Sequence, residues 1–514
     1  MASRTALMRP WCFLAAIVCG LSFWQEPAND PDLGWHLVGG AWISAHHAVP
    51  LHDFINSFNV MWHDYHWLGQ LALYALYTRG GYAVLRLGLG LVMAYICKLI
   101  LDIIDLAAPR EPSTVFVLGC FLGALTLAAA AATVRPQIVA LAVVALAQRR
   151  LIQPPRRWEL PYLFLLAVLL VNVHIYWVFL PVLWGLYRCV PRIVGAAAPA
   201  APYAWGGLTL LALAGLVSPY GLIPYSFSPP FVFMNYALIW DLFTTPAALK
   251  AAIAEFRRSL GVPGLQAWLL LAYIVIIART VRTRQLLTDC GNTVACLLSL
   301  ALAIQSRKFL PLFAIMSLPY VARHVGAVVR LHLKGSLLRW DQRAAPVAVA
   351  FVLVAGTAIA ARHIPWPHTT PTYIHEFTAC RHIAGMGLVP RPPRDHIRVV
   401  TDFNHGGWCR WVLYQERPDL DVRVTTDGRT QWVPVEHYLA AFGLANAAGD
   451  WLYTLKRWKP DVLVLQKGTP LANALALAPA LGKQVFEDEH FTVFLGATLA
   501  DDAAPPAADR PAAP

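Results

Sequence analysis

The chain has 514 residues, of which 58% are hydrophobic and 14% are charged, and its formal net charge is +12. Soluble globular proteins carry about 25% charged residues, so this composition excludes an ordinary soluble enzyme. The basic residues occur in short loops between apolar runs, which indicates membrane orientation and not a nucleic-acid-binding surface. We therefore predict a multispanning membrane protein that has membrane lipids, and no nucleic acid, as partners.

Apolar runs recur from the N-terminus to about residue 362, and each membrane crossing needs about 20 mostly apolar residues. The first run, residues 11–24, follows Arg4 and Arg9 and is expected to remain as an uncleaved anchor with a cytoplasmic N-terminus. The segment 66–78 is expected to lie in the membrane interface. The other predicted spans are 82–104, 114–132, 136–149, 160–173, 175–190, 203–218, 264–281, 289–305, 309–322 and 345–362, which gives about eleven in total.

After about residue 363 the composition changes to short β-like runs that alternate with helical stretches. The predicted strands are Ile397–Thr401, Val422–Thr425, Val462–Leu465 and Phe491–Leu495, and the predicted helices are Val433–Ala445 and Leu471–Leu481. The sequence thus predicts an all-α polytopic membrane domain over residues 1–362, with its first outer loop at 26–81. A small extracytoplasmic α/β domain follows at 363–499, and an Ala/Pro-rich, disordered tail at 500–514.

Two acids, Asp30 and Asp32, stand at the start of the first outer loop. A carboxylate near the membrane surface can act as a general base toward a hydroxyl, or hold a divalent cation beside a phosphate. The alternative is that both acids are solvated and cap a helix that begins near Leu33. The histidines of the same loop match no tight zinc motif, so we predict no metal site built from them.

Cations form a second candidate set at the outer ends of the predicted spans. Arg307 and Lys308 lie between two apolar runs, where charge is costly unless it is paired, hydrated or used by a ligand. An Arg side chain matches phosphate oxygens, and Lys adds a point charge. Arg135, before Pro136, and His174 are expected on the same face. The alternative is that each residue anchors a helix end among lipid headgroups.

Cys380 and Cys409 are the two cysteines of the predicted outer domain. They form either a disulfide in an oxidising compartment or two buried thiols. Gly406-Gly407 is expected to form a turn at the start of a helix. The absence of a Walker loop from the sequence leaves an ATP-driven pump unsupported.

Taken together, several motifs resemble those of bacterial polytopic glycosyltransferases of the GT-C type. These motifs are Asp30-Pro-Asp32-Leu-Gly-Trp35-His36, His52-Asp53-Phe54, His66-Trp67-Leu68, Arg135-Pro136, Asn172-Val-His174, Pro219-Tyr-Gly221, Arg307-Lys-Phe-Leu-Pro, Gly406-Gly407-Trp408 and Thr426-Asp427-Gly428-Arg429. In two places the chain departs from the family pattern. It has Tyr65-His66-Trp67-Leu68 where His-Glu-Trp-Leu is expected, and Ile239-Trp240-Asp241 where Glu-Trp is commoner.

The resemblance implies transfer of a sugar from a polyprenyl-phosphate donor to a glycan, lipid or protein acceptor at the outer face of the bacterial inner membrane. It implies that Asp30 or Asp32 is the base or a metal ligand, and that Arg307, Lys308 and Arg135 bind the donor phosphate. Further predicted substrate contacts are His174, His36, Asp53 and His66. Two alternatives stay open for the cofactor: the protein needs none, or it needs a divalent cation (Mg²⁺ or Mn²⁺). The alternative functions are a flippase for lipid-linked glycans, which predicts repeats that we do not find, and a non-catalytic envelope scaffold.

Overall fold

We describe the fold from a computed structural model. It describes residues 30–57, 61–108, 113–195, 203–221, 262–332, 376–390, 394–429 and 434–496, together with isolated residues between them. Contacts divide the chain into two compact units. The helical unit comprises Met1–Gln25, Ala83–Pro224 and Pro230–Pro367, and the mixed unit comprises Glu26–Tyr82, Tyr225–Pro229 and His368–Pro514. Each unit is described by itself.

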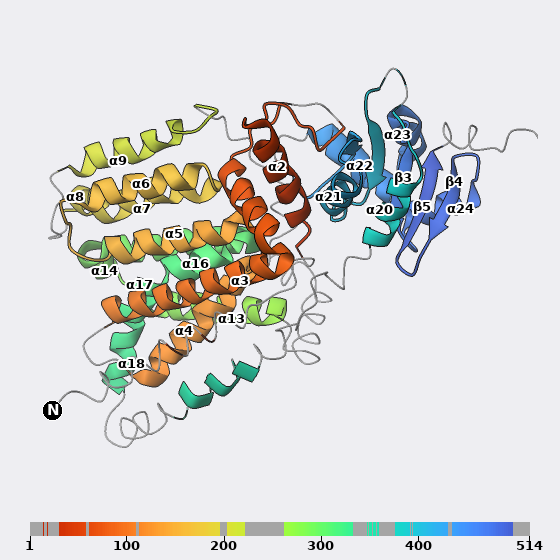
Figure 1. The fold of residues 1–514 in the computed structure, drawn as a ribbon. Coiled ribbons are helices and arrows are strands. Elements are labelled where there is room, and N and C mark those ends of the chain that lie inside the picture. Colours follow the sequence, from red (N-terminus) through yellow and green to blue (C-terminus); the bar gives the residue numbers. More distant parts are fainter. Residues whose placement is uncertain are drawn as a thin grey trace, which may run out of the picture. The chain divides into compact units, whose positions relative to one another are not determined.

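Helices build the described part of the helical unit (Figure 1). They are α3 (Trp67–Ala107, from Ala83 onward), α4 (Thr114–Ala128), η2 (Ala129–Ala131), α5 (Pro136–Leu151), α6 (Glu159–Val171), η3 (Ile175–Val178), α7 (Phe179–Trp184), η4 (Gly185–Cys189), α8 (Val190–Ile193), α9 (Ala204–Leu213), η5 (Ala214–Leu216), α13 (Val262–Thr280), α14 (Thr283–Thr288), α15 (Cys290–Gln305), η6 (Arg307–Phe309), α16 (Leu310–Met316), α17 (Leu318–Tyr320), η7 (Val321–Val325) and α18 (Gly326–His332). These elements confirm the predicted helical domain.

Two helical stretches, Trp67–Ala107 and Leu310–Val329, are long and apolar enough to cross a membrane. Five shorter apolar helices accompany them within the described residues: Phe116–Ala128, Glu159–Val171, Ala204–Leu216, Trp268–Thr280 and Cys290–Gln305. The predicted number of spans is therefore not confirmed. The predicted spans 11–24 and 345–362 lie largely outside the described residues, and the tail 500–514 lies wholly outside them.

The long helix α3 is interrupted at Gly80 and Gly81. Gly81 has φ +60° and ψ −151°, a conformation that only glycine adopts readily. The boundary between the two units follows directly, between Tyr82 and Ala83. The predicted segment 66–78 is thus helical and belongs to the mixed unit, and its place in the membrane interface stays a prediction.

One glutamate and two arginines form buried ion pairs that join three elements of the helical unit. Glu159 is 1% exposed and accepts from Arg150 at 3.3 Å and from Arg188 at 2.5 Å. Separating these elements would leave a buried charge without its partner, which is costly. The ion pairs therefore stabilise the mutual positions of α5, α6 and η4.

The mixed unit contains a five-stranded sheet with the order β2-β1-β3-β5-β4. Its strands are β1 (Ile397–Thr401), β2 (Val422–Val424), β3 (Val462–Gln466), β4 (Gly482–Glu487) and β5 (Phe491–Gly496). The first three are parallel to one another, and β5 pairs antiparallel with both β3 and β4. The four predicted strands are confirmed. β4 was not predicted because it is a largely exposed edge strand rich in polar residues.

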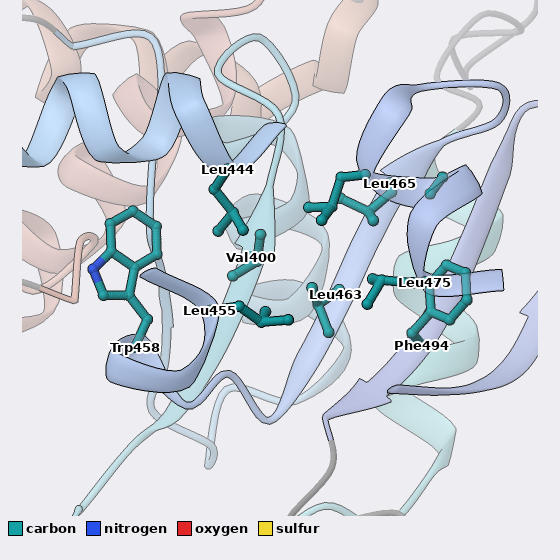
Figure 2. Packing of buried hydrophobic residues seen from close by; sticks show 10 residues of the cluster. Val400, Leu444, Leu455, Trp458, Leu463, Leu465, Leu475 and Phe494 are labelled. Atoms are coloured by element: carbon teal, nitrogen blue, oxygen red, sulfur yellow. The ribbon is translucent and has the colours of Figure 1, made fainter. Parts of the chain in front are cut away.

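Further helices complete the mixed unit, and α2 packs against α21. They are α2 (Leu33–His46), α20 (Glu376–Gly385), α21 (Gly406–Glu416), α22 (Val435–Ala445), α23 (Trp451–Trp458) and α24 (Pro470–Leu477). Figure 2 shows the core, where Val400, Leu463 and Phe494 of the strands pack against Leu444 and Leu475 of the helices. The predicted helices that became α22 and α24 are confirmed, and α21 begins at Gly406 as predicted. The predicted α/β domain is therefore present, and the segment 26–82 packs with it in one unit.

Candidate active site

The first outer loop meets the sheet domain through α2 and α21. A Cβ atom on Gly34 would lie 2.6 Å from the backbone nitrogen of Trp408 and closer still to the carbonyl oxygen of Gly407, so only glycine permits this approach. The indole Nε1 of Trp408 donates a hydrogen bond to the backbone oxygen of Asp30 at 2.9 Å. Two motifs that lie more than 370 residues apart in the sequence are thereby joined.

The two predicted acids have different surroundings. Asp30 is 2% exposed, and its Oδ1 accepts the backbone N–H of Asp32 at 2.9 Å. Asp32 is half-buried and occupies the N-cap position of α2, but its side chain makes no capping hydrogen bond. Its carboxylate instead lies against Gly428, where an added Cβ would collide with Oδ1. The capping alternative therefore fails for the side chain of Asp32.

The loop that follows β2 places Arg429 between two carboxylates. Asp427 Oδ1 accepts from Arg429 Nε at 2.9 Å, and Asp427 Oδ2 accepts from Nη2 at 2.5 Å. The same Nη2 lies 3.1 Å from both carboxylate oxygens of Asp53. Burial opposes the charge on this guanidinium, but the two carboxylates outweigh it and raise the pKa of Arg429. Both acids therefore have a fixed cationic partner.

Aromatic rings line the buried guanidinium. The Cζ atom of Arg429 lies 4.5 Å from the centre of the Trp62 ring and 5.7 Å from that of Trp35. These are cation–π distances in a buried setting, where such contacts are strongest. The ring of His36 lies 3.6 Å from that of Trp35 at a tilt of 35°, and the ring of His66 lies 5.3 Å from that of His36. The predicted residues His36 and His66 thus meet around Trp35.

Asp64 is a further carboxylate of this region and is completely buried. Its Oδ1 accepts from the backbone N–H of His66 at 3.1 Å and from Gln70 Nε2 at 2.9 Å. Burial raises its pKa to about 7, although the His66 N–H and the charge of Arg429 act in the opposite direction. The nearby Asp53 also raises this pKa. The proton on Asp64 is therefore exchanged near neutral pH.

We call these residues the acidic cluster: Asp30, Asp32, Asp53, Asp64, Asp427 and Arg429. Asp30, Asp32 and Asp53 were predicted as site residues from the sequence. The resemblance motif included Asp427 and Arg429 without a role, and Asp64 was missed. Asp64 stands in a run of His, Trp and Tyr, but its burial depends on contacts that no local pattern encodes.

A second set of predicted residues meets within the helical unit. The hydroxyl of Tyr176 accepts from Gln137 Nε2 at 2.9 Å and donates to the backbone oxygen of Lys308 at 3.2 Å. The ring of His174 lies 4.5 Å from that of Tyr176. The segments that begin at Arg135, His174 and Arg307 are therefore neighbours, as predicted from the topology.

We call these residues the basic cluster: Arg135, Gln137, His174, Tyr176, Arg307 and Lys308. The side chain of Lys308 is exposed, and that of Arg307 lies outside the described residues, although its backbone forms part of η6. Their predicted role in phosphate binding stays a proposal.

The divalent cation, one of the two cofactor alternatives, stays a prediction. No group of three or more His, Cys, Asp or Glu side chains in the described part of the chain is arranged to hold one. Between Asp53 and Asp427 the positive charge is that of Arg429. The chemistry that we derive for this site does not use a metal.

Comparison with known proteins supplies the fold class. No protein-family model and no curated protein matches the chain. The chain is similar to the Archaeoglobus fulgidus oligosaccharyltransferase tethered with an acceptor peptide, at a TM-score of 0.51 and 12% identity, over 90% of this chain and 70% of that one. The apo form of that enzyme aligns at 0.46 and 12% identity, over 89% and 69%. ArnT from Cupriavidus metallidurans bound to undecaprenyl phosphate aligns at 0.39 and 15% identity, over 96% and 98%. The chain is thus similar in fold to the oligosaccharyltransferase.

Proposed function

We propose that the chain is a membrane glycosyltransferase that moves a sugar from a polyprenyl-phosphate-linked donor to an acceptor hydroxyl or amide. The observation that carries the proposal is the acidic cluster, in which three distant motifs meet. Asp30-Pro31-Asp32, Gly406-Gly407-Trp408 and Asp427-Gly428-Arg429 contact one another through backbone and buried side chains. The fold shared with an oligosaccharyltransferase supports the same reaction class.

Within the cluster we assign the role of general base to Asp32. It is more exposed than Asp30, and its carboxylate is not engaged in capping α2. In the proposed step the acceptor oxygen or nitrogen attacks the anomeric carbon, and Asp32 takes the acceptor's proton. The bond from that carbon to the phosphate oxygen breaks, and the lipid phosphate leaves with the electron pair. A positioned base contributes about 10²–10⁴ in rate.

Asp30 is proposed as a positioning residue. Its Oδ1 holds the backbone N–H of Asp32, and its backbone oxygen is held by Trp408. Loss of the Asp30 carboxylate would therefore release the turn that orients Asp32. This assignment predicts that changes at Asp30 lower stability as well as turnover, whereas changes at Asp32 lower turnover alone.

Recognition of the leaving phosphate is assigned to the basic cluster. Fixed cations stabilise charge as it develops on a leaving group, and this is often the largest contribution to catalysis. Lys308 offers an exposed ammonium, and Arg135 is half-buried beside a helix start at Pro136. The same proposal includes four further expectations. The protein lies in the bacterial inner membrane, crosses it about eleven times, carries its site at the outer face, and selects the acceptor with its sheet domain.

The test uses the purified full chain in lipid with a pool of labelled polyprenyl-phosphate sugars, and it measures release of free polyprenyl phosphate. We expect Asp32→Asn to lower turnover by about 10²-fold or more with an unchanged melting temperature. Arg307→Ala should also lower turnover, mainly through kcat, because the proposed cation stabilises charge that develops on the leaving phosphate. The matched controls are Asp450→Asn, an exposed N-cap acid of α23, and Arg282→Ala, an exposed arginine before α14. Turnover that survives both Asp32→Asn and Asp30→Asn would sink the proposal.

A further inference from the structure

Two cysteines of the mixed unit meet between α20 and α21. Cys380 and Cys409 are each 0% exposed, and their sulfur atoms lie 2.9 Å apart. The two helices pack along one another, so the sulfur atoms are brought together by secondary structure and not by a loose loop. The other seven cysteines of the sequence belong to the helical unit.

We propose that Cys380 and Cys409 are a modification site, where a disulfide bond fixes α20 to α21 in the mature protein. The inference does not rest on the proposed reaction, but it shares the outer-face location that belongs to the proposed function. It requires only that the sheet domain matures in an oxidising compartment, where disulfides persist. The oxidant is a disulfide-bearing thiol oxidoreductase or a small disulfide.

The reaction is a thiol–disulfide exchange. One protein thiolate attacks the oxidant's disulfide and forms a mixed disulfide, which releases the first oxidant thiol. The second protein thiolate then attacks its partner's sulfur and releases the second oxidant thiol. The two protons of the cysteine thiols end on the two thiols of the oxidant, so atoms and electrons balance.

The bond has a structural consequence for the acidic cluster. Helix α21 carries Gly407 and Trp408, which pack against Gly34 and hold the backbone of Asp30. The Arg381–Glu416 ion pair also joins α20 to α21, at the surface of the protein. Arg381 pairs with Glu416 at 3.0 Å with both side chains more than 40% exposed, and such a surface pair contributes little. A covalent link would therefore add to the packing that holds α21 against α20.

The experiment is peptide mapping of the full chain, isolated from cells under acid quench and alkylated in denaturant without reductant. Trypsin cleaves after Arg362 and Arg381, and after Arg398 and Arg410, so each cysteine falls in its own peptide, 363–381 or 399–410. We expect these two peptides to be joined, with a mass two hydrogens below the sum of the free peptides. If both cysteines carry the alkyl label although no reductant was added, they are free thiols, and the proposal is wrong.

A second measurement tests the stabilising role. Reduction should lower the melting temperature of the wild type by about 5 °C, because closing a loop of this length restricts the unfolded chain. The Cys380→Ala/Cys409→Ala chain should not respond to reductant. The control Cys189→Ala, a buried thiol of the helical unit, should respond as the wild type does. If the two peptides are joined but reductant leaves the melting temperature of the protein unchanged, the disulfide does not have the stabilising role.

Discussion

Asp64 shows how burial can shift the pKa of a side chain more than its charged neighbours do. The carboxyl is fully buried, and its pKa is raised to about 7, mainly by burial. Between the ordinary pKa of 3.8 and this value, the folded chain keeps a proton that the unfolded chain has lost. The free energy of unfolding therefore falls as pH rises through this window, and it levels off above the folded pKa.

We expect Asp64→Asn to remove this dependence, because the amide does not titrate in the window. The melting temperature of the variant minus that of the wild type should rise between about pH 5 and about pH 8. Melting curves of the full chain in detergent, with Asp450→Asn as the control, measure the difference. A difference that stays constant with pH would show that Asp64 is not the group that titrates.

Arg429 is the positive charge that the acidic cluster depends on. Arg429→Ala would leave Asp53 and Asp427 buried without their cationic partner, and breaking a buried pair costs about 3–5 kcal/mol. Arg423→Ala is the matched control, since Arg423 lies within β2, the strand that precedes Arg429, and pairs with the more exposed Asp421. The two free energies of unfolding, measured by denaturant titration, should differ by more than about 2 kcal/mol. Equal values would contradict the role of Arg429 as the internal counter-ion.

At the scale of elements, the contact between α2 and α21 depends on one small residue. A side chain on Gly34 would meet the backbone of Gly407 and Trp408, which can move only if the helices separate. We expect Gly34→Ala to lower the free energy of unfolding by about 1–3 kcal/mol, the usual cost of overpacking. Gly385→Ala, at the end of α20 with open space around its Cβ, is the control. It should be neutral or stabilising, so a similar loss at both positions would count against the close approach.

The same elements show what the sequence could and could not predict. Strand β3 begins with four consecutive Val and Leu residues, and β1 contains Ile397, Val399 and Val400. Both were predicted because most of their residues are buried and apolar. The edge strand β4 carries mostly polar, exposed positions, so periodicity did not mark it. The short amphipathic helix α23 was not predicted either.

At the scale of the whole molecule, the motifs predicted the fold class, and the contacts between them came only from the structure. Asp30, Asp32 and His36 were predicted as site residues from their spacing and from the family resemblance. That the oxygen of Asp30 accepts from Trp408 could not be predicted, because patterns of period two or 3.6 report only local structure. The burial of Asp64 was missed for the same reason.

The central claim is that Asp32 acts as the base in a position that Gly428 leaves open for it. A double-mutant cycle on turnover tests the claim, with Asp32→Asn, Gly428→Ala and the combined variant compared with the wild type. Because an added Cβ on Gly428 collides with the Asp32 carboxylate, we expect Gly428→Ala alone to lower kcat strongly. In the Asp32→Asn background the same change should cost almost nothing, which gives a large coupling energy. Independent, multiplicative losses would contradict the account and move the catalytic base away from Asp32.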